Sequence, residues 1–226
     1  MPPEMPPVLS PADGIVRRLL REVADFAFAS VCAGCGATGT ALCGSCAAGL
    51  APRVVHPRSD AVTLRAGLAF DGTAAAVLRA VKEDGQTSLI RSLRPALEAA
   101  VDDLCAGASA PRRIDVVVPV PTTRAAFRRR GFRVPELLAR GTGIPMLRAL
   151  SYTRRVRDQR TLGVRERRSN LGGGLIATRA GGGMAALIVD DVITTGATCE
   201  EAARALRAAG FQVVGAVAVA ATRRRG

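Results

Sequence analysis

The stretch AALIVDDVITTGAT, residues 185–198, says more about fold and function than any other part of this 226-residue chain. Residues 185–189 are all apolar, as in a strand buried in the middle of a parallel sheet. Asp190 and Asp191 follow where that strand is expected to end, and open α/β sheets bind ligands at the carboxyl ends of their strands. A small, hydroxylated loop comes next, and the helix expected from about Thr198 directs its positive end toward the same point. The stretch therefore predicts a sugar phosphate site.

The string LIVDDVITTGAT is similar to the phosphoribosyl pyrophosphate (PRPP) signature of the type I phosphoribosyltransferases. The resemblance implies that Asp190 and Asp191 hold the ribose 2′ and 3′ hydroxyls. It assigns the 5′-phosphate to a loop made of Thr194, Thr195, Gly196, Ala197 and Thr198. The loop differs from a Walker A motif, because no Gly-Lys-Ser/Thr follows and the acids precede the glycine. The alternative is an ordinary strand-to-helix turn with solvated acids.

Length and composition indicate one α/β domain with a small appendage. A chain with 48% hydrophobic residues buries a sizeable core, and with no Trp and 3% aromatic residues that core must consist of Ala, Val and Leu. No apolar run approaches the roughly 20 residues of a membrane helix, so no membrane insertion is expected. The first ten residues, MPPEMPPVLS, do not resemble a signal peptide, and a cytoplasmic location is the default expectation.

The net charge of +13 is concentrated in one segment. Lys82 is the only lysine, and residues 124–168 contain 14 arginines against three acidic residues, a local net charge of +11. A basic stripe of this kind meets nucleic acid or neutralises the diphosphate of a small substrate. The alternative is a solvated loop and helix face.

Two C-x2-C pairs near the N-terminus predict a structural zinc ribbon. The four thiols belong to Cys32, Cys35, Cys43 and Cys46, with seven residues between the pairs. Four thiolates satisfy a tetrahedral ion and leave no open position, as in structural zinc sites. A redox dithiol is the alternative. Cys105 and Cys199 are interpreted as small apolar residues, although the expected helix start at Cys199 favours a lowered thiol pKa.

The remaining pattern alternates strands and helices. An amphipathic helix is expected before the cysteines, over about residues 13–26, and residues 51–60 form a proline-containing link. Strands are expected near 66–70, 114–120, 185–189 and 213–220, and helices near 74–82, 89–104, 134–140 and 198–209. This order implies parallel pairing with right-handed crossovers. The predicted domains are residues 1–60, containing the helix and zinc ribbon, and residues 61–226.

Taken together, the motifs resemble those of the ComF family, named for a late competence protein needed in DNA uptake. Four segments carry the likeness beside the PRPP signature: the four-cysteine ribbon, LAFDGTAAAVLRAVKEDG, VVVPVPTTRAAFRRRGF and TRRVRDQRTLGVRERRSNL. The last is similar to a mobile loop seen also in amidophosphoribosyltransferases. The resemblance implies a type I phosphoribosyltransferase-like parallel sheet flanked by helices, with a small N-terminal zinc ribbon.

The resemblance also implies roles for individual residues. Val120 and Arg124 belong to the loop that faces the pyrophosphate, and Lys82 matches a family lysine that adds a cation, its alternative being a solvated lysine. Arg160 lies on the segment expected to close over the site, where a planar guanidinium suits phosphate binding. Magnesium is expected with PRPP, held mainly by diphosphate and ribose oxygens.

The chain departs from the family pattern at three places. Many ComF-like chains continue with a second cysteine ribbon, and none is found between Cys46 and Leu64. Arg130-Gly131-Phe132 is followed by Arg133-Val134-Pro135 where the family usually has Asn-Gln, and three glycines, residues 172–174, replace an expected Gly-Ala-Phe. None of these departures touches the two acids or the phosphate loop.

Three functions remain open. The first is an enzyme that transfers phosphoribose from PRPP to an unidentified nitrogen acceptor with inversion at carbon 1 and release of pyrophosphate. The second is a non-catalytic PRPP or nucleotide sensor. The third is an accessory protein of DNA uptake, in which the ribbon and the arginine stripe meet single-stranded DNA or a DNA-processing protein. The few aromatic residues argue against a dedicated single-strand binder.

Overall fold

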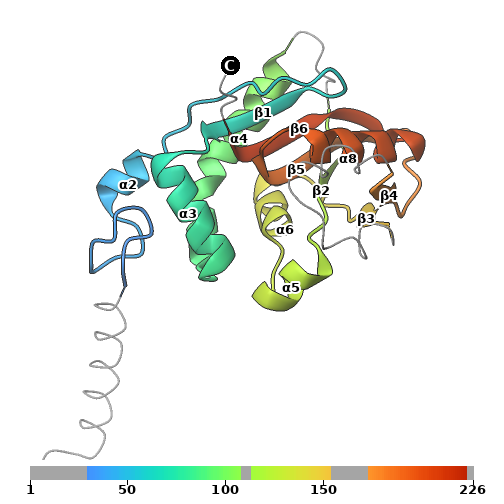
Figure 1. The fold of residues 1–226 in the computed structure, drawn as a ribbon. Coiled ribbons are helices and arrows are strands. Elements are labelled where there is room, and N and C mark those ends of the chain that lie inside the picture. Colours follow the sequence, from blue (N-terminus) through green and yellow to red (C-terminus); the bar gives the residue numbers. More distant parts are fainter. Residues whose placement is uncertain (1–29, 108–112, 154–172, 223–226) are drawn as a thin grey trace, which may run out of the picture.

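The fold is built on a four-stranded parallel sheet. A computed structural model describes residues 30–107, 113–153 and 173–222. The strands are β1 (Leu64–Ala69), β2 (Val116–Pro119), β5 (Ala185–Ile193) and β6 (Gln212–Ala221), in the order β1-β6-β5-β2 (Figure 1). All three pairings are parallel. The sheet therefore brings the carboxyl ends of β2, β5 and β6 side by side.

Helices cover both faces of this sheet, as the sequence pattern predicts. The six helices among the described residues are α2 (Gly44–Ala48), α3 (Gly72–Glu83), α4 (Ile90–Ala106), α5 (Arg124–Arg130), α6 (Val134–Ala139) and α8 (Ala197–Ala208). Short 3-10 turns lie at η1 (Thr87–Leu89) and η2 (Arg140–Thr142). No helix among the described residues has the length and apolar character needed to cross a membrane.

The two sides of the sheet bury separate apolar clusters because the side chains of β5 alternate. Leu187 and Val189 enter the cluster formed with α3, α4 and α6, whereas Ala186 and Ile188 enter the cluster formed with α8. A strand buried on both faces reads as a continuous apolar run, which explains the composition of residues 185–189. The core is made of Ala, Val and Leu with few aromatic side chains, as predicted.

Close backbone packing fixes α4 against the sheet. A Cβ atom added to Gly67 of β1 would lie 1.8 Å from the carbonyl oxygen of Ala96. Only glycine permits this approach between a strand and a helix. The contact sets the height of α4 above the edge strand.

A separate two-stranded antiparallel hairpin consists of β3 (Leu150–Tyr152) and β4 (Leu175–Ala177). Helix α8 holds β4 through two side chains. Glu201 accepts a hydrogen bond from the N–H of Leu175 at 3.1 Å, and Arg204 donates to the carbonyl of the same residue at 2.9 Å. The arginine-rich segment 154–172, between the two strands, lies outside the described residues, as does the predicted N-terminal helix.

The four predicted strands and the four helices predicted after residue 60 are present with shifted ends, and the most informative shift concerns β5. The strand continues to Ile193 instead of ending at residue 189, so Asp190 and Asp191 lie inside its last part. They stay in register there with β6, where Asp190 pairs with Ala218. The acid pair is therefore held by the sheet itself.

Candidate functional site

The acid pair of β5 contacts a lysine from the opposite half of the chain. Lys82, in the last turn of α3, donates to Oδ1 of Asp191 over 2.6 Å. The N–H of Asp191 in turn donates to Oδ1 of Asp190 over 2.8 Å. Both side chains of the ion pair are largely covered, with 24% of Lys82 and 15% of Asp191 exposed. Lys82 thus lies at the acid pair and is not a solvated lysine.

Asp190 is the more perturbed of the two acids. Burial raises the pKa of its carboxyl to about 7, and the charge of Asp191 adds to the effect. The N–H of Asp191 and the charge of Lys82 act in the opposite direction. One carboxyl of the pair therefore takes up a proton near neutral pH, which is characteristic of ligand-binding and catalytic sites.

The loop after β5 joins the strand directly to the start of α8. Gly196 has φ +86 and is the residue before the first helical position, and its own N-terminal neighbours are exposed. The hydroxyl of Thr195 accepts a hydrogen bond from the N–H of Ala197 at 3.3 Å, and the carbonyl of Thr194 accepts one from Thr222 at 3.0 Å. The loop presents backbone N–H groups at a helix N-terminus, which is an anion-binding arrangement.

The end of β2 lies beside the acid pair. The N–H of Val120 donates to the carbonyl of Val189 over 2.9 Å, so the chain leaving β2 passes next to Asp190. Thr123 then caps α5 by accepting from the N–H of Ala126 at 3.3 Å. Arg124 is the first residue of that helix. The site residues predicted on β2 and on β5 therefore meet at one edge of the sheet.

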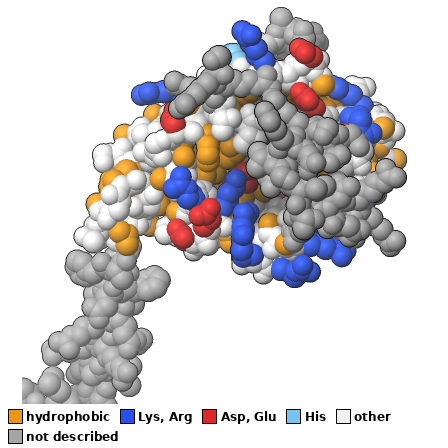
Figure 2. All heavy atoms as spheres, viewed as in Figure 1, with side chains coloured by type: hydrophobic (Ala, Val, Ile, Leu, Met, Phe, Trp, Pro, Cys, Tyr) orange, Lys and Arg blue, Asp and Glu red, His pale blue; other side chains and the backbone are white. Residues whose placement is uncertain are grey.

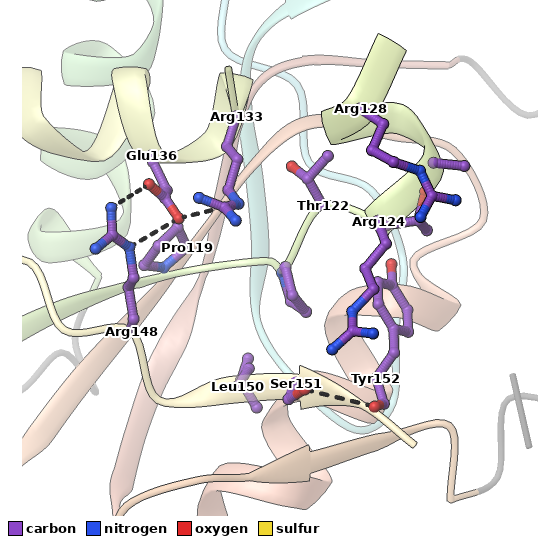
Figure 3. A pocket seen from close by; sticks show the side chains of 13 residues that line it. Pro119, Thr122, Arg124, Arg128, Arg133, Glu136, Arg148, Leu150, Ser151 and Tyr152 are labelled. Carbon is purple, nitrogen blue, oxygen red and sulfur yellow. Dashed lines mark hydrogen bonds and ion pairs between the residues drawn. The ribbon is translucent and has the colours of Figure 1, made fainter. Parts of the chain in front are cut away.

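A cavity of about 500 Å³ opens at this edge, next to the chain that leaves β2 (Figure 3). Its walls include four arginines, Arg124, Arg128, Arg133 and Arg148, against one acidic residue, Glu136. Proline and hydroxyl side chains form the floor, with Tyr152 and Ser151 contributed by β3. The lining is strongly basic and suits an anionic ligand.

Tyr152 connects the cavity to the acid pair. Burial raises the pKa of its phenol to about 12, and the charges of Asp190 and Asp191 contribute to the shift. Tyr152 packs against the apolar cluster of α8, on the face of the sheet to which Ala186 and Ile188 belong. The cavity therefore lies next to the acid pair.

Sequence reasoning missed the buried acid of this cavity. Glu136 is 8% exposed and binds Arg148 through two hydrogen bonds, of 2.9 and 2.7 Å. The sequence does offer one indication: Glu136 is the single acidic residue between Arg124 and Arg148, and a glutamate among arginines can be buried when it pairs with one of them. Tyr152 is the only tyrosine, which gives no comparable signal.

The four predicted cysteine ligands converge. The sulfur atoms of Cys32, Cys35, Cys43 and Cys46 all lie within 4.8 Å of one another. A tetrahedral zinc thiolate site requires about 3.8 Å between sulfurs, and the Sγ atoms of Cys35 and Cys43 are 3.7 Å apart. Backbone N–H groups, that of Cys43 first, lower the pKa of Cys32 to about 6. The four residues are therefore positioned to bind a metal ion.

This cysteine cluster packs against the first turn of α3. A Cβ atom added to Gly34 would lie 2.5 Å from Sγ of Cys46 and 3.1 Å from Cγ2 of Thr73. Lys82 lies nine residues beyond Thr73 on the same helix, near its C-terminal end. One helix thus separates the cysteine cluster from the acid pair.

One expectation is wrong, and another concerns a residue outside the described part of the chain. Cys199 is buried, and burial together with the charges of Asp190 and Glu200 raises the pKa of its thiol well above the ordinary value, so the expectation of a lowered pKa is wrong. The helix start does lie there, but removal from water outweighs it. Arg160 lies outside the described residues, and its predicted role stays a prediction.

The exposed arginines of α5 form a basic surface. Arg124, Arg128 and Arg129 are exposed, and no buried residue lies in the helix. Figure 2 shows basic side chains gathered at the lower margin of the molecule, where Figure 1 places α5. The described part of the basic segment is therefore partly cavity wall and partly open surface.

Comparison with known proteins identifies the type of domain. The family model described as phosphoribosyl transferase domain matches residues 93–226, more than half of the chain. No curated protein matches this chain. Among solved structures, one described as the allosteric regulatory enzyme of purine biosynthesis shares 26% identity over 50% of this chain and 23% of its own, with a TM-score of 0.30. UMP synthase of Leishmania donovani shares 14% identity over 92% of this chain and 36% of its own, with a TM-score of 0.34. The chain thus spans well under half the length of either protein.

Proposed function

Because this chain belongs to the phosphoribosyl transferase domain family, we propose that it binds PRPP and transfers its phosphoribosyl group to a nitrogen nucleophile. The observation that carries the proposal is the acid pair of β5, which leads into a phosphate loop at the start of α8 and lies beside a basic cavity. In this proposal the acid pair binds the ribose hydroxyls, the loop binds the 5′-phosphate and the cavity receives the diphosphate. All three lie at the carboxyl-end edge of the sheet.

The acid pair suits the ribose. Carboxylate oxygens of Asp190 and Asp191 accept hydrogen bonds from the 2′ and 3′ hydroxyls, and charge-assisted bonds of this kind are strong and directional. Lys82 holds Asp191 in place and keeps its charge compensated before the ligand arrives. The sheet register fixes both acids, so little reorganisation is needed on binding.

The phosphate loop suits the 5′-phosphate. Its backbone N–H groups and threonine hydroxyls surround a phosphate, and the dipole of α8 favours negative charge at the same point. The diphosphate then extends toward the end of β2, where Arg124 lines the cavity and Val120 lies between the lining residues Pro119 and Pro121. Magnesium would enter with the diphosphate, would take most of its ligands from substrate oxygens, and would supply positive charge there.

The transfer itself breaks one bond and forms another. The bond between carbon 1 and the diphosphate oxygen breaks, and its electron pair leaves with pyrophosphate. The lone pair of the acceptor nitrogen forms the new bond on the opposite face of the ring, and a proton leaves that nitrogen for solvent. Arginines at the cavity stabilise the charge that develops on the leaving group. Arg160 is proposed to add to this charge stabilisation.

Binding of ribose 5-phosphate and of magnesium PRPP to the full chain tests the donor site by calorimetry. The double variant Asp190→Asn, Asp191→Asn is expected to lose both ligands, while Asp102→Asn, at an exposed acid near the C-terminal end of α4, is expected to keep them. Unchanged binding by the double variant would contradict the assignment of the acids.

The transfer step needs its own experiment. The protein is incubated with magnesium PRPP and a cell metabolite extract, and mass spectrometry follows which compound gains a ribose phosphate. We expect one nitrogen compound to gain it, with pyrophosphate released in equal amount. Tight PRPP binding with no labelled compound would contradict transfer and favour a PRPP sensor.

The wider assignment is also a proposal. The order of four cysteines, the VPVP segment and the PRPP signature supports membership of the ComF branch, with residues 1–60 as a separate unit and residues 61–226 as the transferase unit. The convergence of the four sulfurs supports structural zinc. Bound zinc would tie the two cysteine loops together, as in other small metal-dependent units.

A second candidate function rests on the exposed arginines of α5. A basic helix surface attracts the phosphate backbone of single-stranded DNA, as an accessory role in DNA uptake would require. Changing the exposed Arg128 and Arg129 to alanine is expected to weaken such binding and to reduce its dependence on salt. Absence of DNA binding by the unmodified protein at low salt would remove this candidate.

A further inference from the structure

The cavity contains a second group of arginines that the donor site does not use. Arg148 approaches Glu136 through Nε and Nη2, and Nε of Arg133 lies 3.6 Å from the same carboxylate. Figure 3 shows these three side chains together on one side of the cavity, with Arg124, Arg128 and Tyr152 on the other. The cavity thus has two basic walls.

The three-residue group is preorganised. The guanidinium of Arg133 lies 4.0 Å above the ring of Phe127, so an aromatic face fixes it on one side and Glu136 on another. Arg148 is fixed by its two-point contact with the carboxylate, and 57% of its side chain remains exposed. Each guanidinium has five N–H donors, of which Glu136 occupies only some. The remaining donors are available to a ligand in the cavity.

Glu136 acts here as a support for the arginines. Burial alone would raise its pKa, but the hydrogen bonds and charge of Arg148, aided by Arg133, hold the pKa of the carboxyl below its ordinary value of 4.5. The carboxylate is therefore charged at neutral pH, and the three-residue group has a net charge of +1. With Arg124 and Arg128 opposite, the cavity lining carries a net charge of +3.

The path of the leaving group indicates which ligand contacts the wall of Arg133 and Arg148. Tyr152 marks the side of the cavity nearest Asp190, because it packs against the apolar cluster that contains Ala186 and Ile188, and Asp190 follows these residues on the same face of β5. A diphosphate that extends from the ribose toward β2 therefore enters at the wall of Arg124 and Arg128. In a displacement with inversion the acceptor approaches carbon 1 from the face opposite the diphosphate. The far wall of the cavity then lies beyond the leaving group.

We propose that Arg133 and Arg148, oriented by Glu136, form a second anion subsite that binds pyrophosphate as it moves away from carbon 1. The inference rests on the proposed function and names the path of its leaving group. A cavity of about 500 Å³ has room for the anion at either wall.

Calorimetric titration of the full chain with sodium pyrophosphate, inorganic phosphate and ribose 5-phosphate tests the subsite. Arg148→Gln and Arg133→Gln are each expected to weaken pyrophosphate binding about tenfold, since each removes charged hydrogen bonds. Binding of ribose 5-phosphate is expected to stay unchanged in both. Arg113→Gln is the matched control, because that side chain is 86% exposed and absent from the cavity lining.

Two further variants separate binding from folding and from charge. Arg148→Lys keeps the charge that Glu136 requires but loses the planar fork, so it should fold and bind pyrophosphate with intermediate affinity. Glu136→Gln adds net positive charge to the cavity. If Glu136 orients the arginines, pyrophosphate binding weakens in this variant despite the added charge, and thermal melting verifies that the variant is folded.

Each result has a defined meaning. If Arg148→Gln and Arg133→Gln bind pyrophosphate as tightly as the unmodified protein, the proposed subsite is wrong, and the proposed donor site is unaffected. Inorganic phosphate binding as tightly as pyrophosphate would overturn the assignment to a diphosphate. If the unmodified protein does not bind ribose 5-phosphate, the proposed function itself is refuted.

Discussion

Replacing Asp190 by asparagine should stabilise the fold at pH 8 although it removes a ligand for the ribose. Burial and the neighbouring charge of Asp191 raise the pKa of Asp190 from its ordinary value of 3.8 to about 7 in the folded protein. Between these two pH values the folded state binds the proton more tightly than the unfolded state. The stability that protonation confers is therefore full below pH 3.8 and is lost as the pH rises to about 7.

The size of the effect follows from the same two values. Each pH unit corresponds to about 1.36 kcal/mol of differential proton binding, so the loss of stability across the window is about 4 kcal/mol. Asparagine is neutral throughout and avoids this loss, and its side-chain oxygen still accepts the hydrogen bond from the N–H of Asp191. The variant is therefore expected to gain up to about 4 kcal/mol at pH 8 and almost nothing near pH 4.

Urea unfolding followed by circular dichroism at pH 4.5, 6 and 8 measures the difference, with zinc supplied at the same concentration throughout. Asp60→Asn is the matched control, and at an exposed position it is expected to stay within about 0.5 kcal/mol at every pH. An Asp190→Asn variant that is no more stable than the unmodified protein at pH 8 would refute the reasoning. A gain of equal size at pH 4.5 and 8 would also refute it, since proton linkage would then not be the cause.

Three further predictions concern other parts of the molecule. Gly67→Ala places a Cβ atom against the carbonyl of Ala96 and is expected to lower stability by at least about 1–3 kcal/mol, measured by thermal melting. Cys46→Ser is expected to lose bound zinc and to lower the melting temperature, and full zinc content by elemental analysis would contradict it. Glu201→Gln removes the carboxylate that binds Arg204, whose side chain is 51% exposed, and is expected to cost about 1–2 kcal/mol at pH 7. Because hydrogen bonds from Arg204 and from backbone N–H groups hold the pKa of Glu201 below 4.5 despite its burial, this cost should shrink as the pH falls below that value.

The parts of the site predicted from sequence are those encoded by consecutive residues. The buried strand, the two acids and the loop at the start of α8 follow one another within residues 185–198, and local pattern suffices for each. The four cysteines form a second local pattern, and their sulfurs converge. A fixed spacing along the chain translates directly into geometry when the residues lie in one turn or loop.

Other contacts depend on how distant segments pack, which spacing does not encode. The Lys82–Asp191 pair joins residues 109 apart, and only the position of α3 over the sheet brings them together. The contacts of Glu136 with Arg148 need the turn after α6 to return along β2. The extension of β5 through the acids was also hidden, because aspartate is rare in strands and here ladder pairing with β6 overrides that preference.

The position of β6 has a consequence for synthesis of the protein. Residues 212–221, the last strand along the chain, lie between β1 and β5 at the centre of the sheet. On a ribosome, β1 leaves the exit tunnel more than 140 residues before its partner, and its open edge must wait for that partner. Contacts of such long sequence separation form slowly and leave strand edges exposed to other chains. The nascent chain is therefore expected to depend on chaperones until β6 emerges, and a chain that stops before residue 212 has no complete sheet to hold the acid pair.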